Sequence, residues 1–148
     1  MRGEQTVEIH AGPRRVYELV SDLTRMGEFS PECYRVEWLD GASGPAAGVR
    51  FVGHNRAGPL KWSRLGTVIT AEPGAEFSFV TEERGRQGTI WRYRLTPSAG
   101  GTIATESFEL VWVPWWMHVA HVITRRRRQL RRGMRYTLEH LKGAAELT

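Results

Sequence analysis

The chain has 148 residues, of which 41% are hydrophobic and 25% charged, and its formal net charge is +5. This length suits one domain, residues 1–148, with a sizeable core. No apolar run approaches the ~20 residues that span a bilayer, and the opening MRGEQTVEIH lacks the apolar centre of a signal peptide, so we expect a cytoplasmic protein. The single cysteine, Cys33, excludes an intramolecular disulfide and a paired-cysteine zinc or redox site.

The first thirty residues predict one strand and two short helices. Apolar and polar residues alternate over 6–10, which is typical of a strand. Pro13 then begins a helix, because proline in the first turn loses only a donor that had no partner. Ser21 or Asp22 can cap a second short helix, which the sequence predicts to end at Gly27.

The middle of the chain changes to a period of two, with turn residues between the segments. These segments predict six consecutive strands at 32–40, 49–55, 60–71, 76–83, 88–96 and 102–113. Their short links indicate an antiparallel meander, and the lack of crossover helices excludes a doubly wound nucleotide-binding sheet. Large apolar side chains recur on one face, beginning with Tyr34, Val36 and Trp38, so this face needs a cover.

The last third of the chain predicts one long helix that can provide this cover. Its apolar stripe consists of Val119, Ile123, Leu130, Met134, Leu138 and Leu141. Arg127 shares the stripe, since it lies only ~40° from the direction of Ile123. Burying an unpaired cation is costly, so we expect a paired acid or a polar cavity at that turn. The prediction is an α+β fold, a curved antiparallel sheet of about seven strands wrapped around the helix, with a hollow between them.

Several segments carry a resemblance to a known family. They are VEIHAGPRRVYELVSDLTRMGEFSPE at 7–32, VEWLDG at 36–41, GVRFVGHNRAG at 48–58, Trp62 with the later TAEPGAEFSF, WRYRLTP at 91–97, and GTIATESFEL. With the predicted order of elements, they resemble the START-like superfamily, also called SRPBCC or helix-grip, and especially its polyketide cyclase/dehydrase-like branch. The resemblance covers nearly the whole chain. It consists of pattern motifs rather than catalytic signatures, so it indicates the fold more strongly than the chemistry.

The resemblance implies a hydrophobic pocket for lipids, polyketides, sterols or other apolar or aromatic molecules, usually without a metal. Some members of the superfamily cyclise or dehydrate polyketides, and others carry or sense ligands. A cyclase or dehydratase of this kind needs a general acid or base at a definite place in the pocket. The residues of this chain must supply that group.

The candidate polar groups are Glu106, Arg127, Tyr93 and Asn55. Glu106 faces inward if Phe108 does, because the two share the alternation of their strand. Glu106 and Arg127 could together bind a polar ligand head, or could form only a structural ion pair. Tyr93 and Asn55 could each bind a ligand carbonyl, although Tyr93 also suits the core and Asn55 also suits a turn.

Apolar residues of the predicted sheet and helix are candidate walls for the ligand. They are Trp38, Phe51, Trp62, Phe77, Phe79, Trp91 and Phe108 from the strands, and Ile123 and Leu130 from the helix. The predicted function is therefore binding of a hydrophobic or aromatic small molecule between the sheet and the helix. The alternative is a polyketide cyclase or dehydratase that works by acid–base chemistry in the same cavity.

Other classes of function have less support. Seven arginines lie within 125–135, but no nucleic-acid-reading motif accompanies them, which argues against nucleic acid. The run and the nearby Trp115 and Trp116 leave open a transient contact with an anionic membrane, or a dimer contact, so the chain is expected to be a monomer or homodimer. His118 and His121 lack a third ligand, so no metal site is expected, nor is any cofactor.

Overall fold

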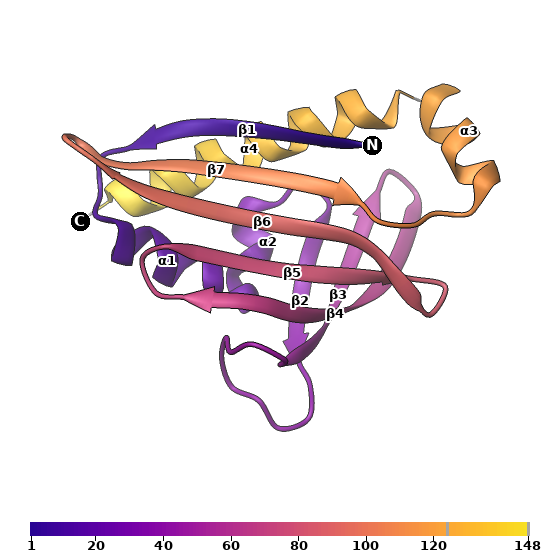
Figure 1. The fold of residues 1–148 in the computed structure, drawn as a ribbon, viewed down its shortest axis with the longest axis horizontal. Coiled ribbons are helices and arrows are strands. Elements are labelled where there is room, and N and C mark those ends of the chain that lie inside the picture. The colour runs from indigo at the N-terminus through magenta and orange to yellow at the C-terminus, as the bar shows by residue number, and fades with distance from the viewer. Residues whose placement is uncertain (124, 148) are drawn as a thin grey trace.

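The computed structural model describes residues 1–123 and 125–147, with only the backbone of Ile123. The described strands are β1 (Arg2–Ile9), β2 (Cys33–Trp38), β3 (Arg50–Ala57), β4 (Leu60–Glu72), β5 (Glu76–Glu83), β6 (Arg86–Ser98) and β7 (Gly101–Leu110). The helices are α1 (Pro13–Ser21), the 3₁₀ turn η1 (Leu23–Arg25), α2 (Met26–Phe29), α3 (Trp115–Ile123) and α4 (Arg126–Glu146). This confirms the predicted α+β helix-grip fold, in which one curved sheet holds a long C-terminal helix (Figure 1).

The seven strands form one antiparallel sheet in the order β1-β7-β6-β5-β4-β3-β2. The strands β2 to β7 are a meander, and β1 joins the far edge beside β7, so α1, η1 and α2 connect the two edges. The pairing of the strands shifts within β2, β4 and β5, and such bulges bend a sheet. The sheet curves without closing, and α4 runs lengthwise beside β1 across its concave side (Figure 1).

The segment between β1 and β2 follows the sequence closely, except at its end. Pro13 starts α1 as predicted, and the Asp22 carboxylate caps η1 by accepting a hydrogen bond from the Thr24 N–H. The prediction that Gly27 ends the second helix is wrong, because Gly27 lies inside α2. Glycine is needed there for a different reason: a Cβ atom at this position would lie 2.5 Å from the Tyr34 carbonyl oxygen.

One half of the concave face is filled by a packed core. Phe77 of β5 is fully buried, and its ring meets Tyr17 of α1 edge-on, with 6.4 Å between ring centroids. Leu138 and Leu141 of α4 are buried in the same cluster as Phe77. The cover of this half is therefore α1 together with the C-terminal half of α4.

Two expected placements of apolar residues are wrong. Tyr34 is exposed, because the shift of pairing between Cys33 and Arg35 changes the alternation there. The predicted single C-terminal helix is divided into α3 and α4, with Arg125 in the left-handed region at φ 54°. The stripe of α3 therefore does not continue that of α4, and Val119 is exposed. Among the described residues, no helix is both long and apolar enough to cross a membrane.

Candidate functional site

The second half of the concave face is hollow. A cavity of about 510 Å³ lies between the sheet and the N-terminal half of α4. Its lining includes the exposed residues Pro31, Gln129 and Arg132, so the cavity reaches the molecular surface near the start of α4. This volume lies in the range of pockets that hold small organic molecules.

Most of the predicted wall and polar residues do line this cavity. They are Phe51, Asn55, Trp62, Phe79, Trp91, Tyr93, Glu106 and Leu130. The register explains why Trp62 is among them, since it lies opposite Asn55 in the pairing of β3 with β4. Asn55 lies within β3 rather than in the following turn.

Three other predicted wall residues do not line the cavity. Phe77 belongs to the packed half of the face, beneath α1. Phe108 is buried against Trp91, with ring centroids 5.8 Å apart, and Trp38 packs edge-on against Phe51 at 6.2 Å. Phe108 and Trp38 thus pack beside wall residues on the neighbouring strands without lining the cavity themselves. The side chain of Ile123, also predicted to bind ligand, lies outside the described residues.

Small residues explain why this half of the face is not filled. Gly53 of β3 lines the cavity, and the single heavy atom within 4 Å of a Cβ at this position is the Cys33 Sγ, at 3.8 Å. Gly133 of α4 lines the cavity from the opposite side. Glycine in a strand interior often marks close approach of a ligand or another backbone, so the sequence carried a signal for Gly53 that our prediction missed.

A buried carboxyl group lies in the wall of the cavity. Glu106 of β7 is only 3% exposed, and it lies directly opposite Tyr93 of β6 in the pairing of the two strands. The Tyr93 hydroxyl donates a hydrogen bond of 2.9 Å to Glu106 Oε2, whereas Oε1 has no partner among the described residues. Unpartnered buried polar atoms are rare in folded proteins, and this one belongs to a residue that lines a cavity.

The surroundings of Glu106 favour its neutral form. Burial raises the pKa of the Glu106 carboxyl to about 8, although the hydrogen bond from Tyr93 acts in the opposite direction. Burial and the neighbouring Glu106 together raise the pKa of the Tyr93 hydroxyl well above its usual range. Near neutral pH, Glu106 is therefore mainly a carboxylic acid, whose proton on Oε1 can be donated to an acceptor in the cavity.

The expected place of Arg127 at the cavity is wrong. Arg127 is exposed and lies with Arg2 and Glu109 in a small surface hollow on the β1 side of α4. The cavity is lined instead by residues that recur at helical spacing from the preceding position, namely Arg126, Leu130, Gly133 and Thr137. The cavity meets only one edge of the buried stripe, at Leu130 and Met134, and Arg127 lies on the β1 side of α4, away from the cavity.

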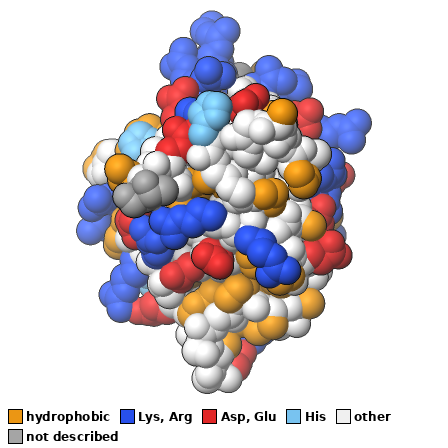
Figure 2. Space-filling view, turned by 90° about the vertical axis from the view of Figure 1, so that its left-hand side faces the viewer, with side chains coloured by type: hydrophobic (Ala, Val, Ile, Leu, Met, Phe, Trp, Pro, Cys, Tyr) orange, Lys and Arg blue, Asp and Glu red, His pale blue; other side chains and the backbone are white. Residues whose placement is uncertain are grey.

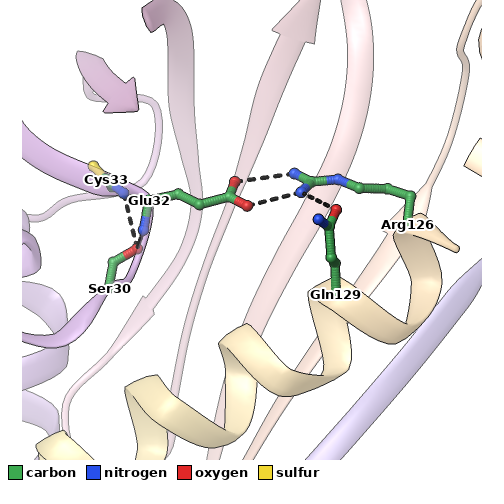
Figure 3. A network of polar contacts seen from close by, with 5 residues as sticks. All are labelled: Ser30, Glu32, Cys33, Arg126 and Gln129. Atoms are coloured by element: carbon green, nitrogen blue, oxygen red, sulfur yellow. Dashed lines mark hydrogen bonds and ion pairs between the residues drawn. The ribbon is translucent and has the colours of Figure 1, made fainter. Parts of the chain in front are cut away.

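Arg126 pairs with an acid that our prediction did not include. Its guanidinium donates two hydrogen bonds to the Glu32 carboxylate, of 2.7 and 3.0 Å, and one of 3.3 Å to the Gln129 side-chain oxygen (Figure 3). Glu32 precedes β2, where the backbone N–H groups of Glu32 and Cys33 donate to Ser30 Oγ. This two-pronged ion pair joins the α2–β2 loop to the start of α4 at the wall of the cavity.

Other polar lining groups are also neutralised or kept neutral. Arg64 and Glu83 form an ion pair of 2.6 Å, and both line the cavity. Burial and the nearby Arg126 lower the pKa of His121, which favours its neutral form. Burial raises the pKa of the Cys33 thiol to about 11, so it is not a reactive thiolate. Among the residues that the structure describes, no three His, Cys, Asp or Glu side chains form a group that could hold a metal ion.

Comparisons with known proteins give matches over nearly the whole chain. The model of a family described as "Polyketide cyclase / dehydrase and lipid transport" matches residues 1–146. A solved structure of a Polyketide_cyc-like protein from Corynebacterium glutamicum is 31% identical, with a TM-score of 0.54, over 98% of this chain and 85% of that one. No curated protein matches the chain.

More distant solved structures show the same fold. The di-domain ARO/CYC StfQ from the steffimycin biosynthetic pathway is 13% identical with a TM-score of 0.79; the match covers 98% of this chain and 50% of StfQ. A protein from Chromobacterium violaceum is 16% identical with a TM-score of 0.73, over 99% of each chain. At these identities the likeness concerns the fold alone.

Proposed function

The chain belongs to the polyketide cyclase/dehydrase and lipid transport family, and from this premise we propose that residues 1–148 form one domain that binds an uncharged apolar or aromatic molecule, lipid-like or polyketide-like, in the cavity under α4. Aromatic side chains provide walls on which a flat or apolar ligand can pack. The ion pairs Glu32–Arg126 and Arg64–Glu83 leave four of the charged lining groups already neutralised.

The observation that carries this proposal is the half-satisfied carboxyl of Glu106. As a neutral acid, Glu106 can donate a hydrogen bond to a carbonyl or hydroxyl oxygen of the ligand. A ligand carboxylate is disfavoured there, because it would lie next to the carboxyl group of Glu106. The described partner of Glu106 is the Tyr93 hydroxyl, and not a cation that could balance a second negative charge. The ligand is therefore expected to be uncharged at the end that reaches Glu106.

A cavity-filling variant tests the proposal. Gly53→Leu places a side chain in the cavity, because Gly53 lines it and a Cβ there meets only the Cys33 sulfur at an ordinary contact distance. We expect its affinity for Nile red, an uncharged apolar dye, to fall by about tenfold or more, while the circular dichroism spectrum and melting temperature stay near those of the unmodified protein.

Gly143→Leu is the matched control. Gly143 lies in α4 and is exposed, and a Cβ atom added to it would meet no heavy atom within 4 Å, so this change should leave dye binding intact. Native mass spectrometry of the purified protein then identifies any ligand that it retains. Equal dye affinity of Gly53→Leu and the unmodified protein would contradict binding in this cavity.

A second candidate function, a polyketide cyclase or dehydratase, is favoured by one observation. A carboxyl group with a pKa of about 8 beside a tyrosine hydroxyl can exchange a proton with a bound substrate near neutral pH. In an aldol cyclisation, the ionised form of Glu106 would take a proton from the carbon between two ketone groups. The acid so formed would return a proton to the carbonyl oxygen as the new carbon–carbon bond forms.

Glu106→Gln separates the two functions. Glutamine keeps the size of the side chain but cannot exchange the proton. If the protein is a cyclase, turnover of a poly-β-ketone analogue is lost in Glu106→Gln although the analogue still binds. If the protein is a carrier, neither form converts the analogue, which is recovered unchanged.

A further inference from the structure

The helix α3 has two faces with different surroundings. Met117 and His121 lie one turn apart on one face and line the cavity. Trp115, Val119 and Val122 recur at helical spacing on the opposite face. The sequence of α3, WWMHVAHVI, contains no Asp, Glu, Lys or Arg. The outward face of α3 is thus as apolar as a buried face.

This outward face is nevertheless exposed. Trp115 is 78% exposed and Val122 is 79% exposed, and Val119 and the neighbouring Trp116 are also exposed. Scattered single apolar residues are normal on a protein surface, but a contiguous apolar stripe on one helix marks a site of contact. The position of α3 at one end of the molecule leaves room for a large partner (Figure 1).

Arginines lie in and beside the segments that adjoin α3. The Arg84 guanidinium lies 5.1 Å from the ring centroid of Trp116, and that of Arg86 lies 4.2 Å from the ring centroid of Trp112. Arg127 and Arg128, in the first turn of α4, are exposed. Of the nearby acids, Glu83 is paired with Arg64, and Glu109 shares a surface hollow with Arg127.

The other end of the molecule has a different surface. Figure 2 views the end that lies opposite α3, where acidic and basic side chains alternate over the face. There, Lys142 pairs with Glu146 at 2.6 Å and His10 N–H donates to the same carboxylate. The α3 end differs from this face in its exposed apolar helix with no charged residue.

We propose that α3 is a docking surface for an anionic lipid bilayer. Trp115, Val119 and Val122 enter the interface between headgroups and acyl chains, and the arginines around them pair with lipid phosphates. A membrane fits better than a protein partner because the stripe contains no charged residue, whereas Arg84 contacts the adjacent Trp116, Arg86 contacts Trp112 just before α3, and Arg127 and Arg128 are exposed just after it. Docking does not depend on a particular ligand in the cavity. The vesicle experiment can therefore fail while the dye-binding experiment succeeds, and the reverse, so the two failures are distinguishable.

Cosedimentation with vesicles tests the apolar part of this surface. The ligand-free protein should sediment with phosphatidylcholine vesicles that contain phosphatidylglycerol, and Trp115→Ser with Val122→Ser should lower this binding by about tenfold or more. Leu147→Ser is the matched control, because Leu147 is 75% exposed at the far end of α4. Its binding should equal that of the unmodified protein.

The charges are tested separately. Arg127→Gln with Arg128→Gln should weaken binding, whereas Arg14→Gln with Arg15→Gln, on α1 at the opposite end, should not. Raising the salt from about 0.1 M to about 1 M should release the protein, since the Debye length falls from about 10 Å to about 3 Å. Equal sedimentation with pure phosphatidylcholine, or no sedimentation at low salt, would overturn the proposal. The proposal would also be overturned if light scattering showed a dimer that dissociates in the Trp115→Ser, Val122→Ser variant and in none of the others. The stripe would then bind a second copy of the chain.

Discussion

The two halves of the concave face share one sheet and one alternation of side chains, but only one of them is filled. In the packed half, Phe77 is covered by Tyr17 of α1 and by the C-terminal half of α4. In the hollow half, Phe79 and Trp91 line a cavity of about 510 Å³ under the N-terminal half of α4. The strands alone therefore do not decide where a cavity forms.

The difference comes from the cover and from the size of the residues opposite it. The packed half has a second helix, α1, whose buried residues fill the space below α4. The helices that border the hollow half, η1, α2 and α3, contribute only Leu23, Met26, Met117 and His121 to its lining, and this half has glycine at positions 53 and 133. A helix cannot touch every part of a strongly curved sheet, so the part that α1 does not fill stays open.

Matched truncations on α4 give the largest expected contrast between the halves. Leu141→Ala removes a fully buried side chain from the packed half and should lower the free energy of unfolding by about 2–5 kcal/mol. Leu130→Ala is the same change in the cavity wall, where the side chain is only partly buried, and should cost less than about 1 kcal/mol. Urea denaturation measures both, and equal costs would mean that the two halves are packed alike.

The alternation of the strands made the sheet and its inward face predictable from the sequence. In β7, Glu106 and Phe108 both face inward, as their spacing indicated. The strand residues of the cavity wall followed from the same alternation, except where α1 fills the space over them. Phe77 was placed wrongly because the sequence pattern of β5 does not show that α1 lies over it.

The polar partners could not be predicted in the same way. Our prediction brought Glu106 and Arg127 together, either to bind a polar ligand head or as a structural ion pair, and treated the last third of the chain as one continuous helix. The chain instead breaks at Arg125, and α4 presents Arg126 rather than Arg127 to the cavity. Glu106 is paired with Tyr93, its cross-strand neighbour, which only the register of β6 with β7 reveals. Partners across elements depend on where each element begins, and a change of one residue rotates a helical side chain by about 100°.

The dependence of the free energy of unfolding on pH should show that the hollow half contains a buried carboxyl group with a raised pKa, that of Glu106. Below about pH 4.5, Glu106 is protonated in the native and unfolded chains alike. Between about pH 4.5 and 8, the unfolded chain loses this proton while the native protein keeps it. The contribution of Glu106 to stability should therefore fall by about 1.4 kcal/mol for each pH unit and level off above about pH 8.

Urea denaturation of the unmodified protein and of Glu106→Gln, at several pH values, measures this slope. The slope should disappear in Glu106→Gln, so that the variant gains stability relative to the unmodified protein as the pH rises. Glu4→Gln, on the exposed side of β1, is the control and should keep the slope. Parallel curves for the unmodified protein and Glu106→Gln would mean that the carboxyl is ionised in the native state.

The smallest expected effect on stability concerns the ion pair at the mouth of the hollow half. The Glu32 and Arg126 side chains are 29% and 24% exposed, and a partly solvated pair of this kind contributes up to about 1 kcal/mol. Glu32→Gln should therefore change the free energy of unfolding by less than that amount, but it should speed the release of bound Nile red, because the link between the α2–β2 loop and α4 is weakened. Glu28→Gln breaks the pair between Glu28 of α2 and Arg25 of η1, close to this loop in the sequence, without touching the cavity lining, so it should leave the release rate unchanged. Stopped-flow fluorescence measures the rates. A faster release in Glu32→Gln alone would mean that ligand passes this pair, whereas equal rates in both variants would place the entrance elsewhere along the cavity.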